Sequence, residues 1–305
     1  MLYRSALLTA AILFVCACTR TDLGRAPLPD DYQEKFDEWQ NSRMESLTNP
    51  TGWMRLAGMY WLNEGENSFG SGQDVDITLP DGTIPEYAGE FILSNGSVLL
   101  QAADGVDFIH DGESFQQKEI YDGEEALSIE YDSLEWLIIE REDLIGIRLY
   151  NEDNPKVDDF TGFDRYPIDP DWHLKAKFIP AQEDETISIV NVLGQQVDTP
   201  SPGAIEFMKD GELYTLDALE GTDEQMFLIV GDQTNEIDTY QGGRYIYIDY
   251  PEEGSDYTII DFNKIYNPPC AYNLFTTCQL PPMQNRLDLA ITAGEERAEG
   301  WDGLR

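Results

Sequence analysis

Short β-type runs separated by tight-turn dipeptides constrain the fold of this chain more than any other feature. The runs are rich in Ile, Leu, Val, Phe and Tyr, and they occupy residues 91–93, 97–101, 136–141, 145–150, 186–192, 205–207, 226–230, 245–250 and 257–262. Beside them stand the pairs Asp81-Gly82, Asn95-Gly96, Asp111-Gly112, Asp210-Gly211 and Gly242-Gly243. Such pairs readily adopt the positive φ angles of hairpin turns. The pattern predicts a mostly β fold of antiparallel sheets, arranged as sandwiches or barrels.

One helix is predicted before the strands. Apolar residues recur at helical spacing through residues 31–47, with Asp30 or Asp31 as N-cap and Asn49-Pro50 as terminator. The Pro- and Asp-containing segment 153–170 is the best boundary between two halves. We therefore expect a short N-terminal helix plus a first β part over residues 30–152, and a second β part over residues 153–305.

The N-terminus resembles a bacterial lipoprotein export signal. Arg4 precedes a short apolar run, which ends in Val15-Cys16-Ala17-Cys18. We expect a signal peptide over residues 1–17, lipidation of Cys18, a tether over residues 18–29, and an extracytoplasmic protein anchored to a bacterial membrane. Modification at Cys16, an ordinary cleaved signal peptide and an uncleaved anchor are the alternatives.

The charge of the chain excludes one class of partner. The 305 residues include 59 Asp and Glu against 19 Lys and Arg, which gives a net charge of −40. Such a charge repels phosphate backbones, so we expect no nucleic-acid partner. A scattered acidic surface suits a saline habitat, where ions screen the repulsion. The sequence therefore indicates an acidic, halophilic protein.

Two cysteines lie in one short segment near the C-terminus. In an exported protein, Cys270 and Cys278 are predicted first to form a disulfide that closes a small loop. Reduced thiols or a zinc site are the alternatives. A zinc site needs two further ligands, and no second Cys pair follows the predicted signal peptide.

Two sets of motifs carry a family resemblance. The first is GMYWLNEGENSFGS at residues 58–71 with DITLP at residues 76–80. The second combines TYxGGR at 239–244, DFNxxYNPPC at 261–270, CxLPPxxNR at 278–286 and Ala293-Gly294-Glu295. Over about residues 30–297 the chain resembles the DUF1684 family, which includes bacterial lipoproteins and proteins of halophilic archaea. The resemblance implies an architecture and no assigned reaction.

The first motif also resembles the opening of a forkhead-associated (FHA) β-sandwich. That resemblance implies phosphothreonine recognition, which requires Arg or Lys donors. No Lys or Arg stands between Arg55 and Lys118, and acidic Glu86 and Glu90 follow the strand. We expect an FHA-like sandwich without that chemistry.

The second motif set supplies the candidate site. In the interval 210–285 the only cations are Arg244 and Lys264, and Arg286 follows at once. The ligand-binding candidates are Tyr240, Arg244, Asp261, Asn263, Tyr266, Asn267, Asn285 and Arg286. One interpretation is a pocket for a small polar or anionic ligand, with Arg244 and Arg286 as donors beside Asp261 or Asn263. The other is that these side chains satisfy buried backbone groups of an irregular loop.

Catalytic signatures are absent from the sequence. It contains no Gly-x-Ser-x-Gly elbow, no His-Glu-x-x-His pair and no dinucleotide or P-loop motif, so no cofactor or metal is expected. The favoured interpretation is a lipid-anchored binding module for a small molecule or a protein partner. The alternative is an extracytoplasmic hydrolase that uses Arg244, Asp261, Asn263 and Arg286.

Overall fold

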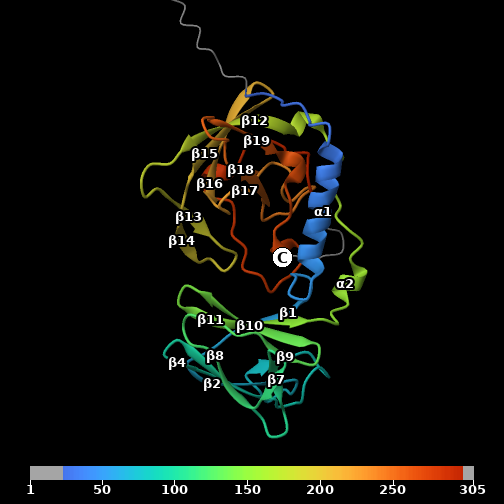
Figure 1. The fold of residues 1–305 in the computed structure, drawn as a ribbon, viewed down its shortest axis with the longest axis vertical. Helices are drawn as coiled ribbons and strands as arrows, with labels where there is room; N and C mark the ends of the chain where they lie inside the picture. Colours follow the sequence, from blue (N-terminus) through green and yellow to red (C-terminus); the bar gives the residue numbers. More distant parts are fainter. Residues whose placement is uncertain (1–22, 298–305) are drawn as a thin grey trace, which may run out of the picture.

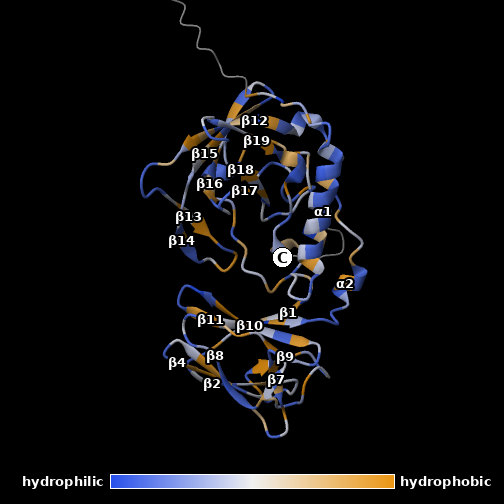
Figure 2. Ribbon diagram, viewed as in Figure 1, coloured by the Kyte–Doolittle hydropathy of each residue, from blue (hydrophilic) through white to orange (hydrophobic). Residues whose placement is uncertain are grey.

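The computed structural model describes residues 23–297 and shows two β parts stacked along its long axis (Figure 1). Strands β1 to β11 form the first part, and strands β12 to β19 form the second. Hydrophobic residues concentrate on the strands of both parts, whereas the connecting loops are largely hydrophilic (Figure 2). The predicted fold class, mostly β with antiparallel sheets and one N-terminal helix, is confirmed.

The first part consists of two sheets with a shared core. One sheet has the order β1-β11-β10-β9-β6-β7 and the other the order β3-β2-β4-β5-β8. Their bounds are β1 Leu56–Trp61, β2 Gly65–Gly70, β3 Ile77–Thr78, β4 Gly89–Ser94, β5 Ser97–Ala102, β6 Phe108–His110, β7 Glu113–Phe115, β8 Gln117–Tyr121, β9 Ile129–Tyr131, β10 Leu134–Arg141 and β11 Leu144–Asn151. The pairing is antiparallel except between β2 and β3. Phe69, Phe91, Phe108 and Trp136 pack together between the sheets.

The second part is one strongly curved sheet with the order β18-β17-β16-β15-β12-β19 and a separate hairpin, β13-β14. The bounds are β12 His173–Pro180, β13 Thr186–Val190, β14 Gln196–Pro200, β15 Gly203–Lys209, β16 Glu212–Glu220, β17 Gln225–Val230, β18 Arg244–Asp249 and β19 Tyr257–Asp261. The two edge strands approach each other, since Thr258 Oγ1 donates to the carbonyl of Asp249 at 2.7 Å. Irregular chain from residue 262 to residue 297 completes this part and covers its core.

Three of the predicted turn pairs join hairpins as expected. Asn95 and Gly96 between β4 and β5 have φ values of 50° and 85°. Asp210 and Gly211 between β15 and β16 have φ values of 52° and 86°. Asp111 and Gly112 between β6 and β7 have φ values of 50° and 77°. Positive φ at both central residues is the type I′ geometry, whose twist matches that of the flanking strands. These local signals therefore set the register of the hairpins.

Helix α1, Tyr32–Thr48, lies along the second part and not along the first (Figure 1). Its buried side chains are Tyr32, Phe36 and Leu47. Tyr32 Oη donates to Asp261 Oδ2 at 2.8 Å, far along the sequence in β19. The helix was expected to group with the first β part because it precedes that part in sequence. The structure instead places it against residues of the second part, more than 200 positions later in the chain.

The predicted tether over residues 18–29 is wrong for the portion that the structure describes. Leu23 and Ala26 are buried, and Ala26 N donates to the carbonyl of His173 in β12 at 2.8 Å. Burial of these two apolar residues holds the segment against the sheet. The predicted signal peptide at residues 1–17 and the lipidation site Cys18 lie outside the described residues. Within residues 23–297, no helix is both long and apolar enough to cross a membrane.

Candidate functional site

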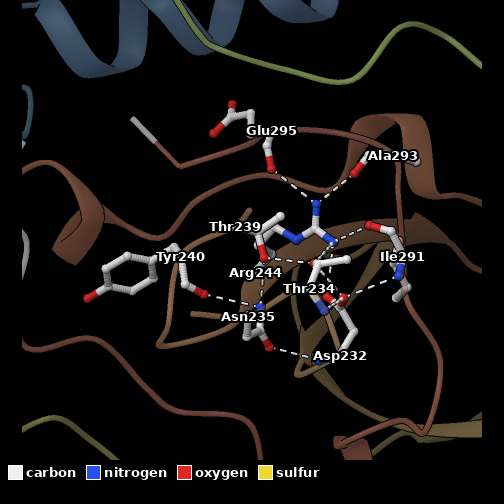
Figure 3. Close-up of polar contacts among 9 residues, drawn as sticks. All are labelled: Asp232, Thr234, Asn235, Thr239, Tyr240, Arg244, Ile291, Ala293 and Glu295. Atoms are coloured by element: carbon white, nitrogen blue, oxygen red, sulfur yellow. Dashed lines mark hydrogen bonds and ion pairs between the residues drawn. The ribbon is translucent and has the colours of Figure 1, made fainter. Parts of the chain in front are cut away.

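Arg244, the first residue of β18, is fully buried in a polar cluster (Figure 3). Its Nη2 lies 2.9 Å from Asp232 Oδ2 and donates to the carbonyl of Ile291 at 2.8 Å. Its Nη1 donates to the carbonyls of Ala293 and Glu295 at 2.6 and 3.0 Å. Asp232 Oδ1 accepts from the backbone N–H groups of Thr234 and Ile291. The cluster therefore fastens the C-terminal segment to the sheet and leaves the guanidinium inaccessible to ligand.

The amides of Asn263 and Asn285 serve the backbone in the same way. Asn263 Oδ1 accepts from Asp169 N at 2.8 Å, and its Nδ2 donates to the Asp169 carbonyl and to Asp261 Oδ1, both at 3.0 Å. Asn285 exchanges two 2.8 Å hydrogen bonds with the backbone of Asp217. Both side chains are buried. The amide of Asn263 thus satisfies the irregular chain at Asp169, and the amide of Asn285 satisfies backbone groups of β16.

Asn267 and Tyr266 surround a second buried ion pair. Arg43 of α1 donates to both carboxylate oxygens of Glu295, at 2.5 and 3.0 Å, and its guanidinium lies 4.2 Å from the centre of the Tyr266 ring. Asn267 N and Tyr272 Oη also donate to Glu295 Oε2, at 2.8 and 2.9 Å. This network anchors α1 to the C-terminal loop.

The predicted convergence of Arg244 and Arg286 on Asp261 or Asn263 is wrong. Arg244 bonds Asp232 and three carbonyls instead, and Arg286 is exposed. Tyr240 is also buried, with its ring directed away from Arg244 (Figure 3). The structure therefore removes the residue set of the hydrolase alternative. The local pattern could not show this, because the partner Asp232 lies outside the motifs.

Cys270 and Cys278 form a disulfide, as predicted, with their Cα atoms 6.0 Å apart. The loop that it closes also contacts the first β part. Asn273 Nδ2 donates to the carbonyls of Trp53 and Leu56 at 3.0 and 2.7 Å. Arg141 Nε donates to Thr277 Oγ1 at 3.3 Å. The disulfide loop is thus one side of the junction between the two parts.

A cavity of about 310 Å³, here called the junction cavity, opens beside this loop. It is lined from three directions, by the β10-β11 hairpin, the β13-β14 hairpin and the disulfide loop. Its lining residues are Trp53, Arg141, Glu142, Arg148, Ile189, Asn191, Gln195, Val197, Tyr245, Pro269, Thr276, Thr277, Cys278 and Gln279. A volume of this size is at the lower end of the range for small-molecule sites, about 300–1,000 Å³.

Two arginines dominate the electrostatics of the junction cavity. Arg148 of β11 lies with its guanidinium 4.8 Å from the centre of the Trp53 ring, and its Nε is buried without a hydrogen-bond partner in residues 23–297. Burial, and then the nearby Arg141 charge, lower the pKa of Arg148. Exposed Glu142 is the one acidic residue in the lining. Sequence analysis missed these arginines, although both stand in β-type runs in a chain poor in cations.

Asp261 and Tyr266 line a different cavity, which lies beneath α1. Both residues are among the ligand-binding candidates predicted from the sequence. Among residues 23–297, no group of three or more His, Cys, Asp or Glu side chains is placed to hold a metal ion.

The family match covers the second β part of the chain and not the first. The family model described as a protein of unknown function, DUF1684, matches residues 158–296. That span includes the second motif set and excludes the first. None of the curated proteins matches this chain.

Three solved structures have similarity to parts of the chain. An uncharacterized protein of Haloarcula marismortui, determined by NMR in solution, is 32% identical, with 46% of this chain and 79% of that chain covered and a TM-score of 0.39. An FHA domain of FhaA, in complex with the intracellular domain of another protein, is 19% identical and has a TM-score of 0.21. It covers 30% of this chain and 96% of its own. A phosphothreonine-dependent FHA domain has the same identity and TM-score, with 30% and 92% covered.

Proposed function

We propose that this chain, which belongs to the DUF1684 family of proteins of unknown function, binds a small organic anion in the junction cavity. The observation that carries the proposal is the pairing of Arg141 and Arg148 in one cavity of a chain whose net charge is −40. Neither arginine forms an ion pair with a carboxylate of residues 23–297. Two cations held together without a counter-charge disfavour each other and favour an anionic ligand.

The geometry suits a carboxylate in particular. The guanidinium of Arg148, which is half-buried in the lining, presents donors in a rigid fork that matches a carboxylate. Gln195 and Thr276 add polar groups, while Trp53 and Ile189 offer apolar contact for the body of a small molecule. Exposed Glu142 at the rim disfavours ligands with several negative charges near it. A mono- or dicarboxylate therefore fits this lining better than a phosphate-rich compound.

The proposal is tested by calorimetric titration of the mature protein with succinate, citrate and inorganic phosphate. We expect saturable binding of a carboxylate, and a loss of about ten- to one-hundredfold in affinity for Arg148→Gln, since hydrogen bonds to charged groups contribute about 1.5–3 kcal/mol. Arg148→Lys retains the charge without the fork, and its affinity is expected to lie between those of the wild type and Arg148→Gln.

Arg286→Gln is the matched control, because Arg286 is exposed and lies outside the cavity. Equal weakening by Arg286→Gln would show a general charge effect and contradict a site at the junction. Absence of binding for all three anions would reject the proposal.

We also propose that the mature chain is lipidated at Cys18 and anchored at the outer side of a bacterial membrane, as the N-terminal pattern indicates. Cys18→Ser is expected to leave the precursor unprocessed or to release the protein into the soluble fraction. Cys16→Ser is the matched control and is expected to mature normally. Normal membrane retention and processing of Cys18→Ser would contradict the anchor.

A further inference from the structure

A second cavity, also of about 310 Å³, lies beneath the N-terminal half of α1 and is here called the helix cavity. We propose that the helix cavity binds a neutral carbohydrate of one or two sugar units. It shares no lining residue with the junction cavity, so this inference stands apart from the proposed anion site. Its lining residues are Pro29, Tyr32, Lys35, Trp39, His173, Gln225, Tyr247, Ile248, Asp249, Ile259, Asp261, Lys264 and Tyr266.

Aromatic faces form one wall of the helix cavity. The rings of Tyr247 and Tyr266 are nearly parallel, with an interplanar angle of 13° and centroids 6.5 Å apart. Tyr247 is 41% exposed although it stands in the middle of β18, and Trp39 faces the same cavity from α1. Apolar C–H faces of pyranose rings stack on such surfaces, and a Tyr or Trp ring provides them at little cost in conformational entropy.

The charges around the helix cavity balance. Lys35 and Lys264 stand against Asp249 and Asp261, in a chain in which acidic residues outnumber basic ones about three to one. Lys35 is further paired with Asp31 at 2.8 Å, and Asp261 accepts the Tyr32 hydroxyl. Neither an anion nor a cation gains from a lining without net charge. A neutral polar ligand is favoured.

Donors and acceptors are both present in the lining of the helix cavity. Asp249 Oδ1 accepts from Gln225 Nε2 at 2.8 Å, which orients the carboxylate and leaves Oδ2 for a ligand hydroxyl. Lys264 adds a donor to the lining. Carboxylate, amide and ammonium groups beside aromatic faces match the vicinal hydroxyls of a sugar, each of which donates and accepts.

The cavity is held in shape before any ligand binds. Helix α1 is fastened at one end by the Tyr32–Asp261 hydrogen bond and at the other by the Arg43–Glu295 pair. Tyr32, Lys35 and Trp39 therefore keep their positions above the sheet. Such preorganisation lowers the cost of ordering the site on binding.

The test is a titration of the mature protein with cellobiose, maltose and diacetylchitobiose, followed by calorimetry and tryptophan fluorescence, since Trp39 lines the cavity. We expect saturable binding of at least one sugar with a dissociation constant of about 1 mM or below. Tyr247→Ala is expected to weaken binding at least about tenfold, a change of about 1.4 kcal/mol. Tyr247→Phe retains the ring face and is expected to bind normally.

Tyr87→Ala is the matched control, because Tyr87 is an exposed tyrosine of the first β part. Thermal melts of each variant show whether the fold is retained. Arg148→Gln is expected to bind sugar like the wild type, so a failure of the anion site is distinguishable from a failure here. Lack of binding for all three sugars, or equal weakening by Tyr87→Ala, overturns the proposal.

Discussion

Arg244 and Asp232 form an ion pair at 2.9 Å in which neither side chain is exposed to solvent. The pair joins the start of β18, the turn after β17 and the C-terminal segment around Ile291. The buried guanidinium donates to backbone carbonyls and the carboxylate accepts from backbone N–H groups, which offsets part of their desolvation. The arginine that the sequence singles out is thus a structural clamp for a segment without strand partners.

Arg244→Ala is expected to lower the free energy of unfolding by about 3–5 kcal/mol, because it leaves the Asp232 carboxylate buried and unpaired. Urea denaturation of the mature protein measures the change. Arg286→Ala, at an exposed position, is the control and is expected to change stability by less than about 0.5 kcal/mol. Equal stabilities for the two variants would contradict the clamp.

Glu295→Gln is expected to destabilise the protein by about 3 kcal/mol, since it breaks the buried ion pair with Arg43. It also places an amide N–H₂ group among the N–H and O–H donors that now bond the carboxylate. Proteolysis should then cleave α1 more readily, because the helix loses its second anchor. Glu34→Gln on the exposed face of α1 is the matched variant. Wild-type protease resistance of Glu295→Gln would count against this anchor.

Removal of the disulfide by the double change Cys270→Ser and Cys278→Ser is expected to lower the free energy of unfolding by about 2–3 kcal/mol. Without the bond, which joins cysteines 8 positions apart, the unfolded chain gains conformational entropy. Thiol titration of the unfolded, unreduced protein checks the bond directly, with no free thiol expected at these two positions. Two reactive thiols would reject the disulfide.

Alkaline pH is expected to destabilise the protein through its buried tyrosines. Burial raises the pKa of Tyr245 and Tyr266 above the ordinary value of 10.0, and the pKa of Tyr272 is raised for the same first reason. The folded state therefore holds these protons after the unfolded chain has lost them. Their contribution is fully present below about pH 10 and is lost as pH rises toward the folded pKa values.

The measurement is a series of urea denaturations between pH 8 and about 11, with tyrosinate absorbance recorded in parallel. Tyr245→Phe removes one titrating group, so the free energy of unfolding is expected to depend less steeply on pH. The variant also loses the 2.7 Å hydrogen bond to the Gln279 carbonyl. Full titration of all tyrosines near pH 10 in the folded protein would contradict this account.

Much of the fold was predictable because its signals are local. The apolar spacing of residues 31–47 predicted α1, and the Asn95-Gly96 and Asp210-Gly211 pairs predicted hairpins that the structure contains. Several strands were missed, among them β12 and β16, whose partly polar sequences owe their conformation to neighbours in the sheet.

The candidate site was less predictable. The motifs drew attention to Arg244, Asn263 and Asn285, which the structure buries in hydrogen bonds to backbone groups. Arg148, which lines the junction cavity, stands in an ordinary β-type run. An arginine in a chain with few cations can be picked out from the sequence. Whether its side chain enters a cavity depends on which face of its strand meets the second part.

The amino-acid sequence by itself determined the strand-and-turn composition, the N-terminal helix, the acidic character and the proximity of Cys270 to Cys278. Each of these follows from residue types, their spacing or separations of a few residues. The tertiary structure alone decided that Arg244 pairs with Asp232 and that α1 packs on residues of the second part. It also brought Arg148 and the disulfide loop to one cavity. Those relationships join residues far apart in the chain, and burial and pairing at such separations depend on how the sheets close, which local spacing does not encode.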